Sequence, residues 1–271
     1  RGPKSTIEVK NENTFLDLAV RQVESLNIRF GTDVPLILMN SFNTHDETEA
    51  YIRKYSSHNI RIITFKQSCY PRIDQATLQP LPQQTFQNDQ KELWNPGGHG
   101  DIYAALYQSG VLENLINQGK EYIFISNVDN LCATVDLNIL YHIMKLDNEF
   151  CMEVTRKTRA DVKGGTLVEY DGTFRLLEVA EIEKKNLSDF LSLKKFEHFN
   201  TNNLWVNLRS IQRLIAPGAF QSDVIVNKKV MMKGQRVLQL ETAAGAVIKH
   251  FPSAIAVEVP RSRFNPVKMT S

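Results

Sequence analysis

The sequence has few cysteines, no long apolar run and almost no charge imbalance, and each shortage excludes a class of protein. Its three cysteines are odd in number and form no Cys-x-x-Cys pair, which argues against a disulfide framework and a zinc site. Reduced thiols of this kind are typical of a cytoplasmic protein. No apolar run approaches the roughly 20 residues that a membrane-spanning helix needs. The formal net charge of +2 indicates neither a nucleic-acid-binding surface nor an acidic tail.

Several catalytic signatures are also missing from the sequence. It contains no complete Walker loop, no Gly-x-Gly-x-x-Gly motif, no Ser-His-Asp order and no histidine cluster of the metal-binding type. What remains is a carboxylate at a strand end, amides in loops, glycine-rich turns and a few isolated cations. This inventory favours phosphoryl or nucleotidyl transfer, in which catalysis is largely positioning and charge neutralisation.

The pattern of apolar residues predicts an α/β protein. The 271 residues, 42% of them hydrophobic, are enough for one large domain or two small ones, and no linker divides them, so we expect one domain over residues 1–271. We expect helices at residues 14–26, 47–55, 136–145 and 208–214, and strands at residues 35–39, 60–65, 122–125, 150–155, 166–169, 174–179, 199–206, 237–240 and 255–259. The strand–helix–strand order at 35–65 implies parallel pairing, whereas the hairpin signal at Asp171-Gly172 indicates a later switch to antiparallel pairing. Residues 69–98 show no sustained period and predict a long loop.

The most informative stretch is residues 121–136. Tyr122–Ile125 is wholly apolar, as in a strand buried on both faces of a parallel sheet, and the polar turn Ser126–Asn130 follows at once. Ligands bind at the carboxyl ends of strands in open α/β sheets. There Asp129 could hold a magnesium ion whose other ligands are water and phosphate oxygens. The alternative is an ordinary strand-ending turn with solvated side chains.

Three further stretches are candidates for ligand binding, each with a structural alternative. Pro96–Asp101 places three glycines before a helix, where backbone N–H groups bind anions, although it could be a plain loop-to-helix connection. The amides in residues 199–206 suit sugar hydroxyls or a polar turn. Arg261, Arg263 and Lys268 lie among prolines, where they would neutralise phosphate or form a solvated basic tail.

Taken together, these stretches resemble those of the eukaryotic UDP-glucose pyrophosphorylase family (UTP–glucose-1-phosphate uridylyltransferases) over essentially all 271 residues. The matching segments are G-P-K-S at 2–5, T-F-L-D-L at 14–18, D-V-P-L-I-L-M-N-S-F-N-T at 33–44, P-G-G-H-G-D-I-Y at 96–103, Y-I-F-I-S-N-V-D-N-L at 122–131, K-T-R-A-D-V-K-G-G-T-L at 157–167, F-N-T-N-N-L-W at 199–205 and V-P-R-S-R-F-N-P-V-K at 259–268.

The resemblance implies a Rossmann-like catalytic domain, with a mixed, mostly parallel sheet flanked by helices and an antiparallel sugar-binding part. It implies a reversible, magnesium-dependent reaction in which glucose 1-phosphate attacks the α-phosphorus of UTP, giving UDP-glucose and pyrophosphate. For the nucleotide and the metal, the resemblance implies triphosphate binding by Lys4, uracil recognition by Gln67 and the backbone of Gly98, and magnesium binding by Asp129. For the sugar, it implies phosphate binding by His99, ribose or sugar binding by Asn127, and glucose binding by Gly165, Glu178 and Asn202. Lys268 would neutralise charge at the α-phosphate. Lys4, Asp129 and Lys268 would be the catalytic residues.

The sequence departs from the family pattern in ways that leave alternatives open. The family's Gly-rich nucleotide loop should precede Gly2, and its C-terminal β-helix domain, which carries oligomer contacts, should follow; we therefore expect a catalytic-domain fragment of a longer protein. Strands that flank the missing strand should then expose unpaired backbone groups. Cys132 replaces a usual glycine. A UDP-N-acetylhexosamine pyrophosphorylase and an inactive nucleotide-sugar-binding fragment remain alternative functions.

Overall fold

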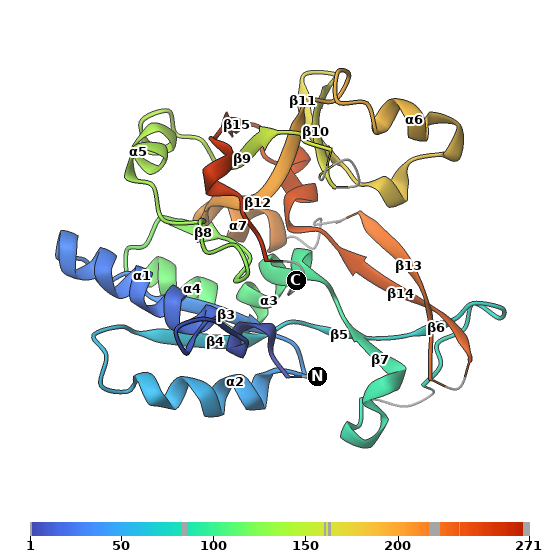
Figure 1. The fold of residues 1–271 in the computed structure, drawn as a ribbon, viewed down its shortest axis with the longest axis horizontal. Coiled ribbons are helices and arrows are strands. Elements are labelled where there is room, and N and C mark those ends of the chain that lie inside the picture. The colour runs from blue at the N-terminus through green and yellow to red at the C-terminus, as the bar shows by residue number, and fades with distance from the viewer. Residues whose placement is uncertain are drawn as a thin grey trace.

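A mixed sheet of six strands forms the centre of the molecule (Figure 1). The structure is a computed structural model that describes residues 2–82, 86–159, 161, 164–216, 223–232 and 234–267. The strands are β1 (Glu8–Lys10), β2 (Asn13–Thr14), β3 (Leu36–Asn40), β4 (Ile62–Lys66), β5 (Cys69–Pro71), β6 (Ile73–Asp74), β7 (Trp94–Pro96), β8 (Tyr122–Ile125), β9 (Phe150–Arg156), β10 (Thr166–Tyr170), β11 (Thr173–Leu177), β12 (His198–Asn207), β13 (Val224–Val230), β14 (Arg236–Thr242) and β15 (Ala254–Glu258). The α-helices are α1 (Phe15–Phe30), α2 (His45–Ile52), α3 (Ile102–Gln108), α4 (Val111–Asn117), α5 (Leu137–Lys145), α6 (Leu187–Phe190) and α7 (Leu208–Ile215).

The central sheet has the strand order β11-β10-β12-β9-β15, and β8 also pairs with β12. Strand β12 runs antiparallel to β8, β9 and β10, whereas β9 and β15 are parallel. The predicted mixed α/β class is confirmed. Parallel pairing is less extensive than we expected, because among the described strands it joins only β9 to β15 and β3 to β4.

The N-terminal part contains the predicted strand–helix–strand unit. Strands β3 and β4 pair in parallel and α2 connects them. Helix α1 begins with the predicted capping box, in which Thr14 and Asp17 satisfy each other's backbone N–H groups. It runs four residues beyond the predicted end, to Phe30, and stops where Gly31 adopts a left-handed φ of 60°.

Strands β3 and β8 each leave one edge unpaired within the described part of the chain. The first pairs with β4 and the second with β12, and both line the same cleft. Along those edges the backbone N–H and C=O groups have no strand partner among the described residues. Our prediction that Tyr122–Ile125 is buried on both faces of a parallel sheet is wrong, because β8 is half-buried and its partner runs antiparallel.

Residues 69–98 are more ordered than their sequence predicts. Strands β5 and β7 pair with each other, and β6 joins β14 of the β13–β14 hairpin. Strands of two or three residues are too short to show a period of two. The partner of β6 lies far along the chain, so no local pattern indicates the pairing.

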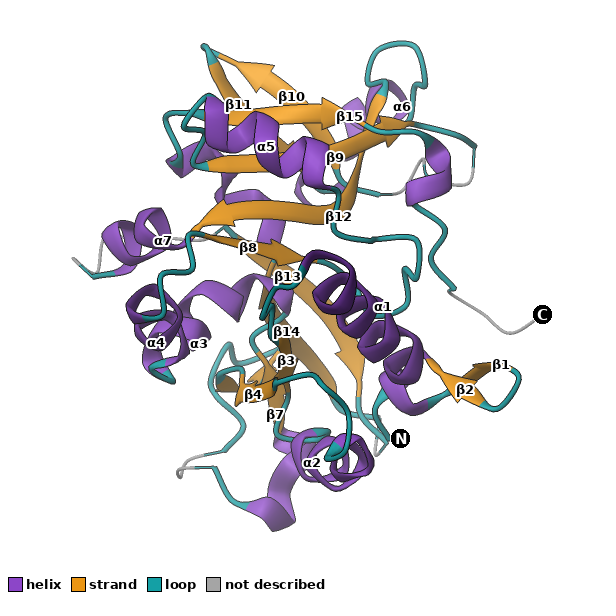
Figure 2. Cartoon of the chain, turned by 90° about the vertical axis from the view of Figure 1, so that its left-hand side faces the viewer, coloured by secondary structure: helices purple, strands orange, loops and turns teal. Residues whose placement is uncertain are grey.

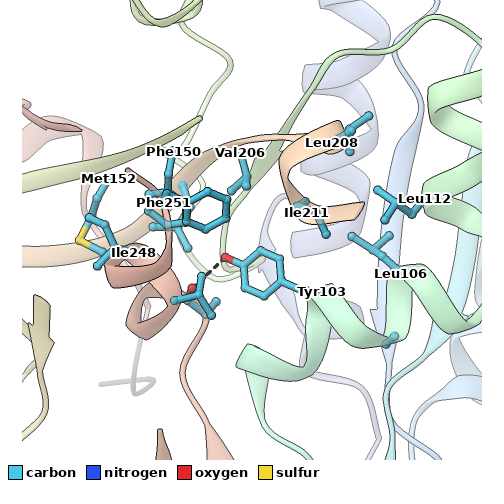
Figure 3. Close-up of a cluster of buried hydrophobic side chains, with 14 of the residues drawn as sticks. Tyr103, Leu106, Leu112, Phe150, Met152, Val206, Leu208, Ile211, Ile248 and Phe251 are labelled. Carbon is cyan, nitrogen blue, oxygen red and sulfur yellow. Dashed lines mark hydrogen bonds between the residues drawn. The ribbon is translucent and has the colours of Figure 1, made fainter. Parts of the chain in front are cut away.

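The hydrophobic core lies between the central sheet and helices α3, α4 and α7 (Figure 3). Tyr103 on α3 is buried among these side chains, and its hydroxyl donates a hydrogen bond to the Ala244 carbonyl at 2.8 Å. Phe150 and Phe251 stack with ring centroids 5.0 Å apart. Helix α5 covers a second part of the sheet (Figure 2). Its Ile139 and Ile143 side chains pack with Trp205. None of the described helices combines the length and apolarity that crossing a membrane would need.

Candidate active site

A cleft of about 1600 Å³ opens between α1, β3, β8 and the polar turn that follows β8. Five of the residues predicted from the sequence line this cleft: Lys4, His99, Asn127, Asp129 and Asn202. They come from segments as far apart as the first turn of the chain and the centre of β12. The predicted ligand-binding position at the carboxyl end of β8 therefore lies in the wall of a large cleft.

Lys4 and Asp129 form an ion pair in this cleft. The Lys4 ammonium lies 2.5 Å from Asp129 Oδ2, and it also donates a hydrogen bond to the Val267 carbonyl at 2.9 Å. The Val267 N–H in turn donates to the Asp129 carbonyl at 3.0 Å. Asp129 is only 6% exposed, so the alternative of a solvated strand-ending carboxylate is wrong. A lysine already acts as the cation that this buried carboxylate requires.

The donor set at this position fits a magnesium ion that shares its ligands with a substrate. No group of three or more His, Cys, Asp or Glu side chains within the described ranges could hold a metal by itself. Magnesium is commonly held by one or two carboxylates, with waters and phosphate oxygens completing its shell. Asp129 can supply one such carboxylate, and the contact with the Lys4 ammonium shows that a cation fits against it.

The glycine-rich turn before α3 is held against the segment 242–244. Gly98 has a φ of +86°, and a Cβ atom there would lie 2.8 Å from the Thr242 carbonyl oxygen, so only glycine fits. The Ala244 N–H donates a hydrogen bond to His99 Nδ1 at 3.0 Å. Because that nitrogen accepts, the neutral ring carries its proton on Nε2.

Gln67 lies beside the glycine-rich turn. The Gly97 N–H donates to the carbonyl of the next residue, Ser68, at 3.1 Å, and the Gln67 N–H donates to the Asn40 carbonyl at 2.9 Å. The Gln67 side-chain oxygen is buried and has no hydrogen-bond partner among the described atoms. An unpaired buried amide oxygen is costly in a folded protein, which makes it a candidate to accept a hydrogen bond from a ligand. Neither Gln67 nor Gly98 lines the cleft at Asp129.

Gly165 and Glu178 lie together, outside the lining of that cleft. A Cβ atom on Gly165 would come within 2.6 Å of Glu178 Oε1, so a larger residue would displace the carboxyl group. Burial, together with the nearby charge of Glu181, raises the pKa of Glu178 to about 7. Near neutral pH, Glu178 can therefore present either a hydrogen-bond donor or an acceptor to a hydroxyl group.

The amide-rich segment belongs to strand β12, so the alternative of a polar turn is wrong, whereas its binding of sugar hydroxyls stays a prediction. It is a bulge in a central strand, where the register to β9 shifts between Asn200 and Asn203. Asn202 adopts a left-handed φ of 59°, and its N–H and side-chain oxygen both bond the Asn200 side chain, at 2.8 and 2.9 Å. The bulge turns Asn202 toward the cleft.

Arg261 and Arg263, two cations of the terminal loop, are each paired with a buried carboxylate. Arg261 donates to both oxygens of buried Asp161, at 2.6 and 2.9 Å. Burial by itself would raise the pKa of Asp161, but hydrogen bonds from Arg261 and Thr158 lower it below its usual value. Arg263 is paired with Glu153. Both guanidinium groups are therefore bound to buried carboxylates, and neither belongs to a solvated tail, whereas neutralisation of phosphate by these arginines stays a prediction. Lys268 lies outside the described residues.

Glu153 and Asn130 are two buried polar residues behind the cleft wall, and we predicted no role for either of them from the sequence. Glu153 is 0% exposed in the middle of the apolar strand β9, and Asn130 directly follows Asp129. A glutamate within an apolar strand is a usable signal, because a buried carboxylate requires a partner. Which partner it has could not be read from the sequence, since Arg263 lies 110 residues away.

Comparisons with known proteins show the family of this chain. The family model for UTP–glucose-1-phosphate uridylyltransferase matches residues 1–271. The chain is 55% identical to the UTP–glucose-1-phosphate uridylyltransferase of Musa acuminata over 270 residues, covering all of this chain and 57% of that protein. It is 52% identical to a probable enzyme of the same name from Schizosaccharomyces pombe, of which it covers 54%. The chain thus spans a little over half the length of these relatives.

Solved structures show the same fold. The UDP-glucose phosphorylase structure of Trypanosoma brucei matches with a TM-score of 0.88 and 39% identity, over 98% of this chain and 59% of that one. A variant of UDP-glucose pyrophosphorylase from Leishmania major, in complex with UDP-glucose, matches with a TM-score of 0.86 and 37% identity, over 98% and 60% of the two chains. With the family model spanning every residue, the chain belongs to the UTP–glucose-1-phosphate uridylyltransferase family.

Proposed function

We propose that the protein carrying these residues transfers the uridylyl group of UTP to glucose 1-phosphate, releasing pyrophosphate and forming UDP-glucose in a reversible, magnesium-dependent reaction. The observation that carries the proposal is the buried Asp129, paired with Lys4 in the wall of a large cleft at the carboxyl end of β8. The family match over the whole chain supports the same reaction. The three free cysteines favour a reducing, cytoplasmic compartment.

The chemistry that this site must supply is neutralisation of phosphate charge. A sugar phosphate is already an anionic nucleophile near neutral pH, so no general base is needed. When bound, magnesium would supply positive charge that neutralises the charge developing on the phosphate oxygens. Asp129 would hold that ion, and Lys4 would exchange its carboxylate partner for a phosphate oxygen of the triphosphate. The Lys4 side chain is 44% exposed, which leaves it room to do so.

The remaining residues would bind and orient the two substrates. Gln67 and the backbone of Gly98 would recognise the uracil, and His99 would donate its Nε2 proton to the sugar phosphate. Asn127 and Asn202 line the cleft and would bind ribose and sugar hydroxyls. Glu178 and Gly165 would complete the glucose site. Lys268 would neutralise charge at the α-phosphate, as the resemblance implies.

The unpaired edges of β3 and β8 favour a second candidate, in which these 271 residues bind the nucleotide sugar without turning it over. A strand and Gly-rich turn inserted between those edges would present N–H groups to the triphosphate. Without them, the reacting groups would lose the positioning that is worth about 7–11 kcal/mol in well-oriented reactions. Full-length protein is therefore the proper material for testing the reaction.

The test is substitution of Asp129 in the full-length protein, with pyrophosphate release measured over a range of magnesium concentrations. We expect Asp129→Ala to reduce turnover by about 10³-fold or more, because the proposed site loses the buried carboxylate that would hold the metal. Asp189→Ala is the control, since Asp189 pairs with Lys195 at 2.7 Å on the surface. Retention of more than about a tenth of the activity at saturating magnesium would refute the assignment. Supplying N-acetylglucosamine 1-phosphate in place of glucose 1-phosphate distinguishes the related pyrophosphorylase activity.

A further inference from the structure

A set of hydrogen bonds around Asn130 joins the Asp129 turn to the terminal loop, and we call it the Asn130 clamp. Asn130 is 3% exposed. Its side-chain NH₂ donates to the Arg263 carbonyl at 3.0 Å, and its side-chain oxygen accepts from the Asn265 N–H at 3.1 Å. The Val267 N–H adds a third bond, to the Asp129 carbonyl at 3.0 Å. One amide thus bonds the loop backbone at two points, directly beside the residue proposed to hold magnesium.

The Arg263 side chain is anchored below the same loop. Its Nε and Nη2 donate to the two oxygens of Glu153, at 2.9 and 2.7 Å. Those oxygens also accept from Asn203 Nδ2 at 3.1 Å and Trp205 Nε1 at 3.0 Å. The carboxylate is fully buried and each of its oxygens accepts two hydrogen bonds, so this anchor is rigid. The loop is therefore held through an arginine side chain on one side and through Asn130 on the other.

The clamp reaches the reacting groups through Val267. Its carbonyl accepts the hydrogen bond from Lys4, whose ammonium also contacts Asp129. Moving the loop would displace the Val267 carbonyl and with it the orientation of Lys4.

We propose that Asn130 is a positioning residue for uridylyl transfer, acting through the terminal loop to fix Lys4 relative to Asp129. The proposal rests on the proposed function of this site. Asn130 is distinguished from a residue that only supports the fold because its two strongest side-chain bonds go to the loop backbone. Its third, to Asn203, is longer at 3.4 Å. The Glu153–Arg263 pair can remain when Asn130 is truncated.

The chain offers a matched control with the same chemistry at another place. Asn27 is 5% exposed, and its side chain bonds both the N–H and the carbonyl of Val34, at 2.8 and 3.0 Å. It thus fixes a loop backbone through a buried amide, as Asn130 does, and neither of the two asparagines lines the cleft. Truncating either residue removes a comparable set of bonds, but only Asn130 holds the loop whose Val267 carbonyl accepts a hydrogen bond from Lys4.

The experiment compares Asn130→Ala and Asn27→Ala with wild type in the full-length protein. Amide hydrogen exchange is followed for Asn265 and Val267, and kcat and KM are measured for UTP and glucose 1-phosphate. For Asn130→Ala we expect both amides to exchange at least about tenfold faster, and kcat to fall by about 100-fold because the reacting groups are misplaced. The KM for UTP should change by less than about threefold, since the uracil site is untouched. Asn27→Ala should change neither the exchange rates of the Asn265 and Val267 amides nor kcat.

The outcomes separate the clamp from the proposed reaction. Unchanged protection of Asn265 and Val267 in Asn130→Ala would overturn the clamp itself. Faster exchange with unchanged kcat would overturn its positioning role, and so would an equal loss of kcat in Asn27→Ala. A wild-type protein without transferase activity would refute the proposed function, and the positioning role with it, whereas the exchange rates would still decide whether the clamp exists.

Discussion

The raised pKa of Glu178 gives a pH-dependent stability whose sign can be worked out. In the unfolded chain this carboxyl titrates near 4.5, whereas burial and the charge of Glu181 raise its pKa in the folded protein to about 7. Between these two values the folded state keeps a proton that the unfolded state has released. Stability must therefore fall as the pH rises through this window, and below pH 4.5 Glu178 has no such effect. The shift corresponds to about 3 kcal/mol above pH 7.

The perturbation that isolates this effect is Glu178→Gln. The glutamine keeps the shape and the side-chain oxygen that caps the turn at Val179–Glu181, but it cannot ionise. Urea denaturation at pH 5 and at pH 8 gives the free energy of unfolding of each protein. We expect the variant to exceed wild type by up to about 3 kcal/mol at pH 8, and by less than about 1 kcal/mol at pH 5, where wild-type Glu178 is mostly neutral when folded.

The control is Glu169→Gln, which removes an exposed carboxylate from the neighbouring strand β10. It should leave the difference between the two pH values as in wild type. If Glu178→Gln changed stability equally at pH 5 and pH 8, the effect would come from packing, and the reasoning from a shifted pKa would be refuted. A variant less stable than wild type at pH 8 would show that the ionised carboxylate has partners that the structure does not reveal.

Two further substitutions test the buried ion pair and the uracil site. Glu153→Gln leaves the Arg263 charge without its buried counter-ion, and we expect a loss of about 3–5 kcal/mol in urea denaturation. The control Glu149→Gln, whose partner Arg213 is half exposed, should lose about 1 kcal/mol or less, and equal losses would contradict the argument. Gln67→Ala in the full-length protein should raise the KM for UTP by a much larger factor than the KM for glucose 1-phosphate. Initial-rate kinetics measure both, and similar changes in the two constants would rule out recognition of the base by Gln67.

Features encoded in neighbouring residues could be predicted, and features that depend on distant partners could not. The capping box of α1 lies within four residues, and the hairpin at Asp171-Gly172 joins strands that are adjacent in sequence, so both were correct. The antiparallel partner of β8 is β12, about 80 residues later, and the apolar pattern of β8 fits either direction. This is why the strand was predicted but its pairing was not.

In the candidate site, too, features set by neighbouring residues could be predicted and features set by distant partners could not. Asp129 was predicted from a local rule, because a polar turn after an apolar strand marks the carboxyl end of that strand. The partners of Arg261 and Arg263 could not be predicted, because the carboxylates that bind them lie 100 and 110 residues earlier. A cation among prolines has the same local sequence pattern whether it faces phosphate, solvent or a buried acid. The alternative of a polar turn around Asn202 arose because a bulge within a long strand resembles a turn in composition.

The hydrogen bond between Lys4 and Val267 spans 263 positions of the sequence, and this separation has a consequence for folding. Closing a flexible loop of that length lowers the chain entropy by an amount worth about 5 kcal/mol, far more than one hydrogen bond returns. The contact can form only after the intervening strands have brought its two ends together. The Lys4–Asp129–Val267 contacts should therefore assemble late in refolding and separate early under mild denaturant. Activity would then disappear before the sheet melts, so that the site reports the integrity of the whole chain.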